Sequence, residues 1–115
     1  MLRGEIRWVD LDPARGSEAN KRRPAVIVSN DGANTTAAHL NRGVITVVPV
    51  TSNVSRVHPF QVLLPARECG LPSDSKAQAE QVRSIAIERI GRRVGQLTAP
   101  LLAELDEALR LHLAL

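Results

Sequence analysis

Short runs of β-branched apolar residues constrain the fold of this chain more than any other feature. Residues 25–28 have the sequence AVIV, and residues 44–48 have the sequence VITVV. Runs of this length and composition are typical of strands that are covered on both faces or wrapped around a closed core. We therefore expect these two segments to be the central strands.

Alternation indicates two further strands. Phe60, Val62 and Leu64 share one parity and are followed by a proline, which predicts a strand over residues 60–64. Near the N-terminus, residues 6 and 8 have the parity of a half-buried strand, but residues 9 and 11 are apolar on the opposite parity. This change implies a bulge or a sharp bend near Trp8. The turn-rich residues 12–20 that follow are expected to form a loop inside the domain.

Helical spacing is clearest at the C-terminus. Thr98 is placed to cap a helix that presents one apolar stripe. The stripe consists of Leu101, Leu102, Leu105, Leu109 and His112. Residues 31–40 are expected to form a short helix. Residues 77–90 fit both helical and strand spacing, so the local pattern leaves this segment open.

The length of 115 residues fits one domain over residues 1–115, because two cores would leave each half near the size that needs disulfides or metals. With 43% hydrophobic and 23% charged residues, the chain is expected to form an aliphatic core rather than remain disordered. Trp8 and Phe60 are the only aromatic residues. This argues against nucleic-acid binding by rows of stacked bases.

Cys69 is the only cysteine, which excludes an intrachain disulfide and thiolate-rich metal sites and favours a reducing compartment. His39, His58 and His112 are far apart in the sequence and do not indicate a metal site. No apolar run approaches the roughly 18 residues of a membrane-spanning helix, and the N-terminus has no signal-peptide core. We expect a cytoplasmic protein without a cofactor, a metal or a membrane contact.

Basic residues are concentrated in the first part of the chain. Residues 1–67 contain nine Lys and Arg against five Asp and Glu, whereas residues 68–115 contain six against seven. Thirteen of the fifteen basic residues are arginine, whose planar fork of donors matches phosphate. The charge distribution therefore indicates a partner that contains phosphate.

The candidate site lies at the ends of the two central strands. A loop before the first strand ends in the charged residues Glu18, Lys21, Arg22 and Arg23, and residues 48–53 (VPVTSN) end the second strand. If the strands are neighbours, Arg23 and Thr51 meet in one cleft and bind a phosphodiester, and Glu18 accepts or donates a proton. Cleavage of RNA by its own 2′-OH needs such a base, donors for the phosphate oxygens and an acid, but no metal. The pattern predicts a ribonuclease centre.

Three blocks of the sequence resemble the MazF/PemK family of toxin-antitoxin endoribonucleases, also called mRNA interferases. They are RGEIRWVDLDPARGSEANKRRPAVIVSND at residues 3–31, VPVTSN at residues 48–53 and AEQVRSI at residues 79–85. The first block is long and specific, whereas Thr-Ser after a strand means little alone. The resemblance extends from about residue 3 to residue 90, and a family-like C-terminal helix follows.

The resemblance implies a mainly β fold, an SH3-like, strongly bent β-barrel with short helices and a C-terminal α-helix. For the open segment it favours a strand ending near residues 81–85. It also implies a homodimer with single-stranded RNA along the subunit interface, and a cognate antitoxin whose acidic segment occupies the basic groove.

Matched by motif, the catalytic residues of the family fall on Arg23 and Thr51, with Glu18 as the expected acid or base. The RNA path is expected along Ser17, Lys21, Arg22, Ser52, Gln81, Arg83 and Ser84. Because an arginine guanidinium stays protonated in proteins, Arg23 is expected to stabilise negative charge rather than to transfer a proton. The alternatives are that Thr51 satisfies the backbone and that Glu18 pairs with Lys21 or Arg22. Some relatives have an acidic residue where this chain has Ala86.

The implied function is that of a type II toxin, a metal-independent, sequence-specific endoribonuclease that leaves 2′,3′-cyclic phosphate and 5′-OH ends. The alternative is a non-enzymatic toxin on the same barrel that grips a protein target, as the gyrase-poisoning relatives do. The presence of Arg23 and Thr51 together favours the nuclease. The recognised RNA sequence would depend on loops at residues 12–20, 52–58 and 67–75, whose shapes one sequence does not fix.

Overall fold

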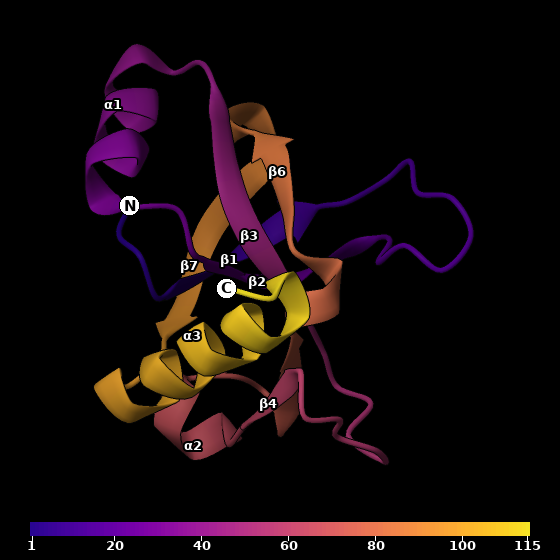
Figure 1. Ribbon diagram of the computed structural model, residues 1–115. Coiled ribbons are helices and arrows are strands. Elements are labelled where there is room, and N and C mark those ends of the chain that lie inside the picture. Colours follow the sequence, from indigo (N-terminus) through magenta and orange to yellow (C-terminus); the bar gives the residue numbers. More distant parts are fainter.

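The computed structural model describes all residues from 1 to 115 and is mainly β (Figure 1). The strands are β1 (Glu5–Asp10), β2 (Arg22–Ile27), β3 (Val44–Thr51), β4 (Gln61–Leu64), β5 (Ser75–Gln78), β6 (Arg83–Ala86) and β7 (Ile90–Gln96). The helices are α1 (Asp31–Leu40), α2 (Ala66–Cys69) and α3 (Ala99–Leu113), with short 3-10 helices η1 (Ala79–Gln81) and η2 (Ile87–Arg89). The strands pair antiparallel in the order β4-β5-β3-β2-β1-β7, and β6 also pairs with β3.

The bend of the sheet occurs along β3, its longest strand. In the first part of β3, Val47 lies opposite Ile27 of β2 on one side and a β6 residue on the other. At its end, Val50 and Thr51 pair with β5 instead. The β4–β5 pair therefore turns away from the main sheet, and α3 packs against β4 (Figure 1). The expected strongly bent, mainly β fold with short helices and a C-terminal helix is confirmed.

Two apolar cores lie on the two faces of the central strands. Val26 and Val48 belong to the core that packs against α3. Their neighbours Ile27 and Val47 belong to the second core, which includes Ala37 of α1. Successive side chains of a strand point to opposite faces. Residues 25–27 and 45–48 therefore lie in β-strands with apolar contacts on both faces, as their composition predicted, while Val28 follows the end of β2 and Val44 is exposed.

The bulge predicted near Trp8 is present, and burial on both faces of β1 adds to the change of parity. Ile6 lies in the core under α3, whereas Val9 and Leu11 lie in the second core, so both parities are buried. The pairing of β1 with β2 is regular throughout. The bulge lies in the pairing of β1 with β7, where the register shifts between Ile6 and Arg7 and again between Arg7 and Val9.

The helix α3 begins at the expected cap, Thr98, and α1 begins at a cap that was not predicted. Asn30 caps α1 through its side chain, and the Thr98 hydroxyl accepts a hydrogen bond from the Leu101 N–H at 3.4 Å. Leu101 and Leu105 are buried against the sheet, which confirms the apolar face of α3. The predicted stripe was wrong at its end, because His112 is exposed on the last turn.

Residues 77–90 form no single element. They contain the end of β5, the two 3-10 helices and β6. The strand favoured by the family resemblance is present as Arg83–Ala86, one residue longer than expected at its end. The sequence pattern does not predict β7, since its arginines and glycines interrupt any apolar alternation.

The strand expected over residues 60–64 begins one residue later, at Gln61. Gln61 is buried because its amide group is satisfied: Nε2 donates to Glu80 at 2.7 Å, and Oε1 accepts from the His58 N–H at 3.1 Å. Phe60 lies outside the strand and stacks on the His58 ring, with the ring centroids 5.1 Å apart.

Gly95 marks the closest approach between β7 and α2. A Cβ atom added there would lie 1.8 Å from the backbone oxygen of Cys69. We expect Gly95→Ala to lower the free energy of unfolding by about 3 kcal/mol, the upper part of the usual range for overpacking. Denaturant titration measures this effect. Gly32→Ala is the control, because its nearest neighbour would be the Asn30 side chain at 3.3 Å. Equal stability of the two variants would contradict the expectation.

Candidate functional site

A hollow of about 280 Å³ lies where β3 separates from β2, and we call it the Arg23 hollow. The residues that line it are Trp8, Lys21, Arg22, Arg23, Pro24, Val50, Thr51, Ser52, Leu71, Pro72, Ser73 and Ser75. The β2–β3 register ends with Ala25 opposite Pro49. Neither Pro24 nor Pro49 has an N–H to donate, so the ladder cannot continue and the two strand ends splay apart.

Arg23 is held at the rim of this hollow by Asn20. The Nε of Arg23 donates to the Asn20 backbone oxygen at 2.8 Å, and Nη2 donates to the Asn20 side-chain oxygen at 3.2 Å. A guanidinium has five N–H donors. Three donors of the half-buried Arg23 are therefore left for a ligand.

Thr51 approaches the same hollow from the end of β3. Its Oγ1 accepts a hydrogen bond from the Asn53 N–H at 3.3 Å. A hydroxyl that accepts one bond still has its own hydrogen to donate. The alternative role of Thr51, satisfying the backbone, is thus present in the structure and leaves the donor free.

Glu18 lies outside the Arg23 hollow. It lines a separate hollow of about 370 Å³ with Glu80, Gln81, Val82 and Arg83, which we call the Glu18 hollow. Its Oε2 accepts from the Arg15 N–H at 3.0 Å, and none of the ion pairs of the molecule includes Glu18. The structure therefore brings Arg23 and Thr51 together and places Glu18 apart from them.

The residues expected along the RNA path are also divided between the Arg23 hollow and the Glu18 hollow. Lys21, Arg22 and Ser52 line the Arg23 hollow. Arg83 lines the Glu18 hollow, and its Nη1 lies 3.5 Å from the Leu11 backbone oxygen. Ser84 lines neither hollow. Its hydroxyl lies instead on the β3–β6 pair, 2.9 Å from the Thr46 hydroxyl.

Gln81 and Ser17 join the loop of residues 12–20 to the sheet. The Gln81 amide accepts from the Ala19 N–H and donates to the Ser17 backbone oxygen, both at 2.9 Å. Lys21, at the end of this loop, has a positive φ of 65° and gives its N–H to Asp12 Oδ1 at 2.9 Å. These bonds fix the direction in which the loop enters β2, and so the position of Arg23.

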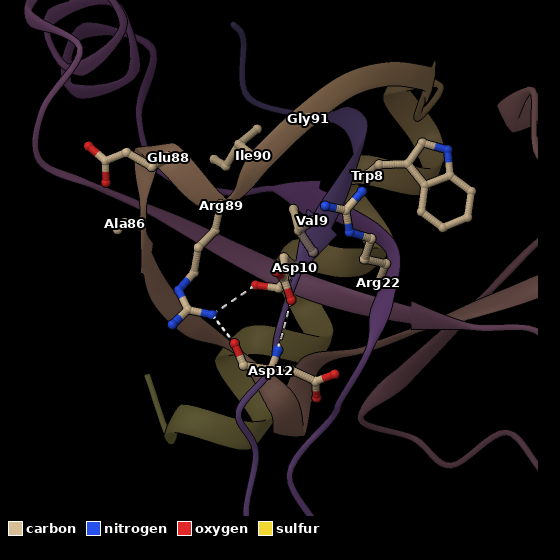
Figure 2. Close-up of a pocket in the computed structure, with 10 residues that line it drawn as sticks. All are labelled: Trp8, Val9, Asp10, Asp12, Arg22, Ala86, Glu88, Arg89, Ile90 and Gly91. Carbon is tan, nitrogen blue, oxygen red and sulfur yellow. Dashed lines mark hydrogen bonds between the residues drawn. The ribbon is translucent and has the colours of Figure 1, made fainter.

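A second cavity, of about 440 Å³, adjoins the Arg23 hollow, and we call it the Asp10 cavity (Figure 2). Its lining residues are Trp8, Val9, Asp10, Asp12, Arg22, Ala86, Glu88, Arg89, Ile90 and Gly91. Trp8 and Arg22 line both spaces. The sequence reasoning missed this cavity because its far wall belongs to η2 and β7, which carried no recognised pattern.

Other reactive groups do not form a site. Burial raises the pKa of the Cys69 thiol, and the nearby Glu68 charge raises it further, which leaves the thiol protonated and unreactive at neutral pH. No group of three or more His, Cys, Asp and Glu side chains is placed to share a metal ion. None of the helices has the length and apolar character needed to cross a bilayer.

Comparison with known proteins decides the family. Residues 2–113 match the family described as PemK-like, MazF-like toxin of type II toxin-antitoxin system. The chain belongs to this toxin family. It is a homologue of endoribonuclease MazF9 of Mycobacterium tuberculosis, with 69% identity over 115 residues that cover 100% of this chain and 98% of that protein.

Solved MazF structures share the whole fold of this toxin. The MazF of Deinococcus radiodurans has a TM-score of 0.82 and 27% identity, with 100% of this chain and 97% of that chain covered. An endoribonuclease from a mycobacterial species, solved in complex with its cognate antitoxin, has a TM-score of 0.78 and 23% identity, with 100% and 96% covered. The family expected from the three sequence blocks is confirmed.

Proposed function

We propose that this toxin is a metal-independent endoribonuclease that cleaves single-stranded RNA at specific sequences. In the proposed reaction the 2′ oxygen attacks the adjacent phosphorus while the bond from phosphorus to the 5′ oxygen breaks. A base takes the proton from the 2′-OH, and an acid gives a proton to the leaving 5′ oxygen. The products would end in a 2′,3′-cyclic phosphate and a 5′-OH.

The single observation that supports this proposal best is the shared hollow of Arg23 and Thr51. Arg23 presents three free N–H donors and Thr51 presents an O–H, while Lys21 and Arg22 add positive charge at the same rim. Donors fixed in advance at a place where negative charge develops are the arrangement that stabilises a phosphorane. We assign Arg23 and Thr51 to that task, Glu18 to a proton transfer, and the remaining basic and hydroxyl groups to RNA binding.

Incubation of the purified protein with a long RNA in EDTA tests the proposal. We expect discrete fragments whose 3′ ends carry a 2′,3′-cyclic phosphate. Such 3′ ends cannot be ligated to an adapter until the cyclic phosphate has been opened and removed, and this resistance identifies them. Intact RNA would overturn the nuclease and favour a toxin that acts by gripping a protein. Fragments that appear only when Mg²⁺ is added would overturn the metal-independent chemistry alone.

Thr51→Val is expected to lower the single-turnover cleavage rate about tenfold. Valine has the shape of threonine but cannot donate a hydrogen bond, and an uncharged donor contributes less than a guanidinium. Thr51→Ser should restore most of the rate because it keeps the hydroxyl. If Thr51→Ser is as slow as Thr51→Val, the loss comes from the altered strand end and not from the missing donor.

Asn20→Ala is expected to slow cleavage about threefold to tenfold, although Asn20 has no role in the chemistry itself. The substitution removes one of the two contacts that orient Arg23 and leaves the backbone contact in place. A double-mutant cycle distinguishes this positioning role. In an Arg23→Ala background, Asn20→Ala should have no further effect on the rate, whereas an equal effect in both backgrounds would contradict it.

We propose that the antitoxin of this toxin inhibits it by occupying the Arg23 hollow. The family is that of toxins in toxin-antitoxin systems, and the hollow gathers Lys21, Arg22 and Arg23 at one rim. An acidic, partly disordered segment would bind such a rim and exclude RNA.

We also propose that the toxin is a homodimer. Three leucines at the end of α3 and just beyond it are exposed, with relative exposures of 59% for Leu111, 49% for Leu113 and 84% for Leu115. A second copy would cover this apolar end. Light scattering should give twice the mass of the chain, and Leu111→Lys should shift it towards the monomer.

A further inference from the structure

The Asp10 cavity continues the surface of the Arg23 hollow without a break in lining residues. Trp8 and Arg22 form the shared wall, and the Asp10 cavity is the larger of the two spaces, at about 440 Å³. Its volume lies within the range of small-ligand sites. A strand of RNA whose phosphate lay in the Arg23 hollow would place a neighbouring nucleotide over this cavity.

The polar groups of the cavity are arranged around the Asp10 carboxylate. Figure 2 shows it between the guanidinium of Arg89 and that of Arg22, with Trp8 beyond Arg22 and Glu88 at the opposite end. Asp10 Oδ1 accepts from the Asp12 N–H at 3.1 Å, and its second oxygen has no protein partner. Although Asp10 lies opposite Arg22 in the β1–β2 register, the two form no ion pair.

Nη1 of Arg89 is bound to the backbone, whereas the whole guanidinium of Arg22 is free. Arg89 Nη1 donates to the Asp10 backbone oxygen at 3.2 Å and also to the Asp12 backbone oxygen. Arg22 is exposed and makes no side-chain hydrogen bond with the protein. The cavity thus offers one fixed carboxylate acceptor beside the free guanidinium of Arg22 and the unused Nε and Nη2 donors of Arg89.

These groups select among possible ligands. A second phosphate is disfavoured, because three carboxylates outnumber two guanidiniums around the cavity. A bound metal ion is disfavoured too, since the carboxylates do not converge on a common point. The remaining match is an uncharged, planar group that offers N–H donors to the carboxylate and an acceptor to the guanidinium.

We propose that the Asp10 cavity is a nucleobase subsite that selects guanine next to the cleaved phosphate, with Asp10 as the specificity-determining residue. Guanine presents two adjacent donors, N1–H and the 2-amino group, beside the O6 acceptor. Cytosine and adenine present a single amino donor, and uracil presents one N–H between two carbonyl oxygens that a carboxylate repels. Single-stranded RNA is recognised in this way, through Watson–Crick edges and stacking on arginine or aromatic planes. This subsite rests on the proposed ribonuclease function.

A randomised RNA pool, cut by the protein and sequenced at the new ends, tests the subsite. Wild-type protein should enrich guanine at one position next to the cut. Asp10→Asn should reduce that preference about tenfold, the effect of losing one good bidentate contact. The asparagine side chain keeps an oxygen that accepts the Asp12 N–H. Its NH₂ group then faces the N–H donors of guanine, and two donors cannot form a hydrogen bond. Cleavage beside other bases should change less than about threefold.

Asp31→Asn is the matched control, because Asp31 also accepts a backbone N–H, from Arg3 at 2.7 Å, but lies at the start of α1. It should leave the base preference unchanged. Discrete cutting without guanine enrichment, or an unchanged preference in Asp10→Asn, would overturn the subsite and leave the ribonuclease standing. Absence of cutting by the wild-type protein would overturn the ribonuclease and the subsite with it.

A measurement on the wild-type protein removes any dependence on how well Asp10→Asn folds. Inosine differs from guanosine only in lacking the 2-amino group. An oligonucleotide with inosine at the selected position should be cut about fivefold more slowly than its guanosine counterpart. Equal rates for the two oligonucleotides would overturn the role of the carboxylate.

Discussion

Arg23→Ala is expected to lower the single-turnover rate of RNA cleavage about a hundredfold to a thousandfold, the loss that follows removal of one preorganised donor to a developing oxyanion. The three unused donors of Arg23 face a hollow shared with Thr51. Because negative charge on the phosphate oxygens grows as the 2′ oxygen attacks, the guanidinium contact is stronger in the transition state than in the ground state. The loss should therefore fall mainly on the maximal rate and less on RNA affinity.

Two variants separate this effect from a general loss of positive charge. Arg42→Ala removes an exposed arginine after α1, outside the Arg23 hollow, and should slow cleavage only slightly. Arg23→Lys keeps the charge but loses the planar fork, so its rate should lie between those of the wild type and Arg23→Ala. An unchanged maximal rate in Arg23→Ala would remove Arg23 from the mechanism.

The central part of the fold could be predicted from composition because burial on two faces leaves a strong signal. Val26 and Ile27 face different cores, and so do Val47 and Val48, which requires apolar residues without alternation. The same fact acts together with the bulge near Trp8, which the sequence predicted. A change of parity between Ile6 and Val9 is what a strand shows when each of its faces meets its own core.

The rest of the fold depends on contacts that local pattern does not record. Gln61 is polar yet buried because two residues satisfy its amide group: His58, three positions earlier in the chain, and Glu80, nineteen positions later. β7 has almost no apolar alternation and is held by its pairing with β1 and by the approach of Gly95 to Cys69. Residues 77–90 contain the end of one strand, two 3-10 helices and a second strand within one ambiguous pattern.

For the candidate site, residue types at strand ends predicted which groups meet but not what holds them. Arg23 and Thr51 share a hollow as expected, since β2 and β3 are neighbours. The amide oxygen of Asn20 accepts from the Arg23 guanidinium, and the amide of Gln81 bonds to the backbone of the loop. Such contacts are set by the path of the loop and leave no spacing signal in the sequence.

Glu18→Gln is expected to lower the cleavage rate about a hundredfold and to change the shape of the pH–rate profile. A group that transfers a proton in the transition state contributes at least this much. The amide of glutamine can still accept the Arg15 N–H that Glu18 accepts now, so the loop turn should survive. Single-turnover rates across the pH range, with unfolding curves for both proteins, measure the effect.

Glu104→Gln is the control for the loss of one negative charge, because Glu104 is exposed on α3 away from both hollows. Pairing with Lys21 or Arg22, the alternative role of Glu18, is not formed in the structure, so a rate loss could not come from breaking it. Glu18 instead shares its hollow with Arg83, and it acts on the phosphate only if RNA draws the loop towards the Arg23 hollow. A profile that Glu18→Gln leaves unchanged in height and shape would assign the proton transfer to another group.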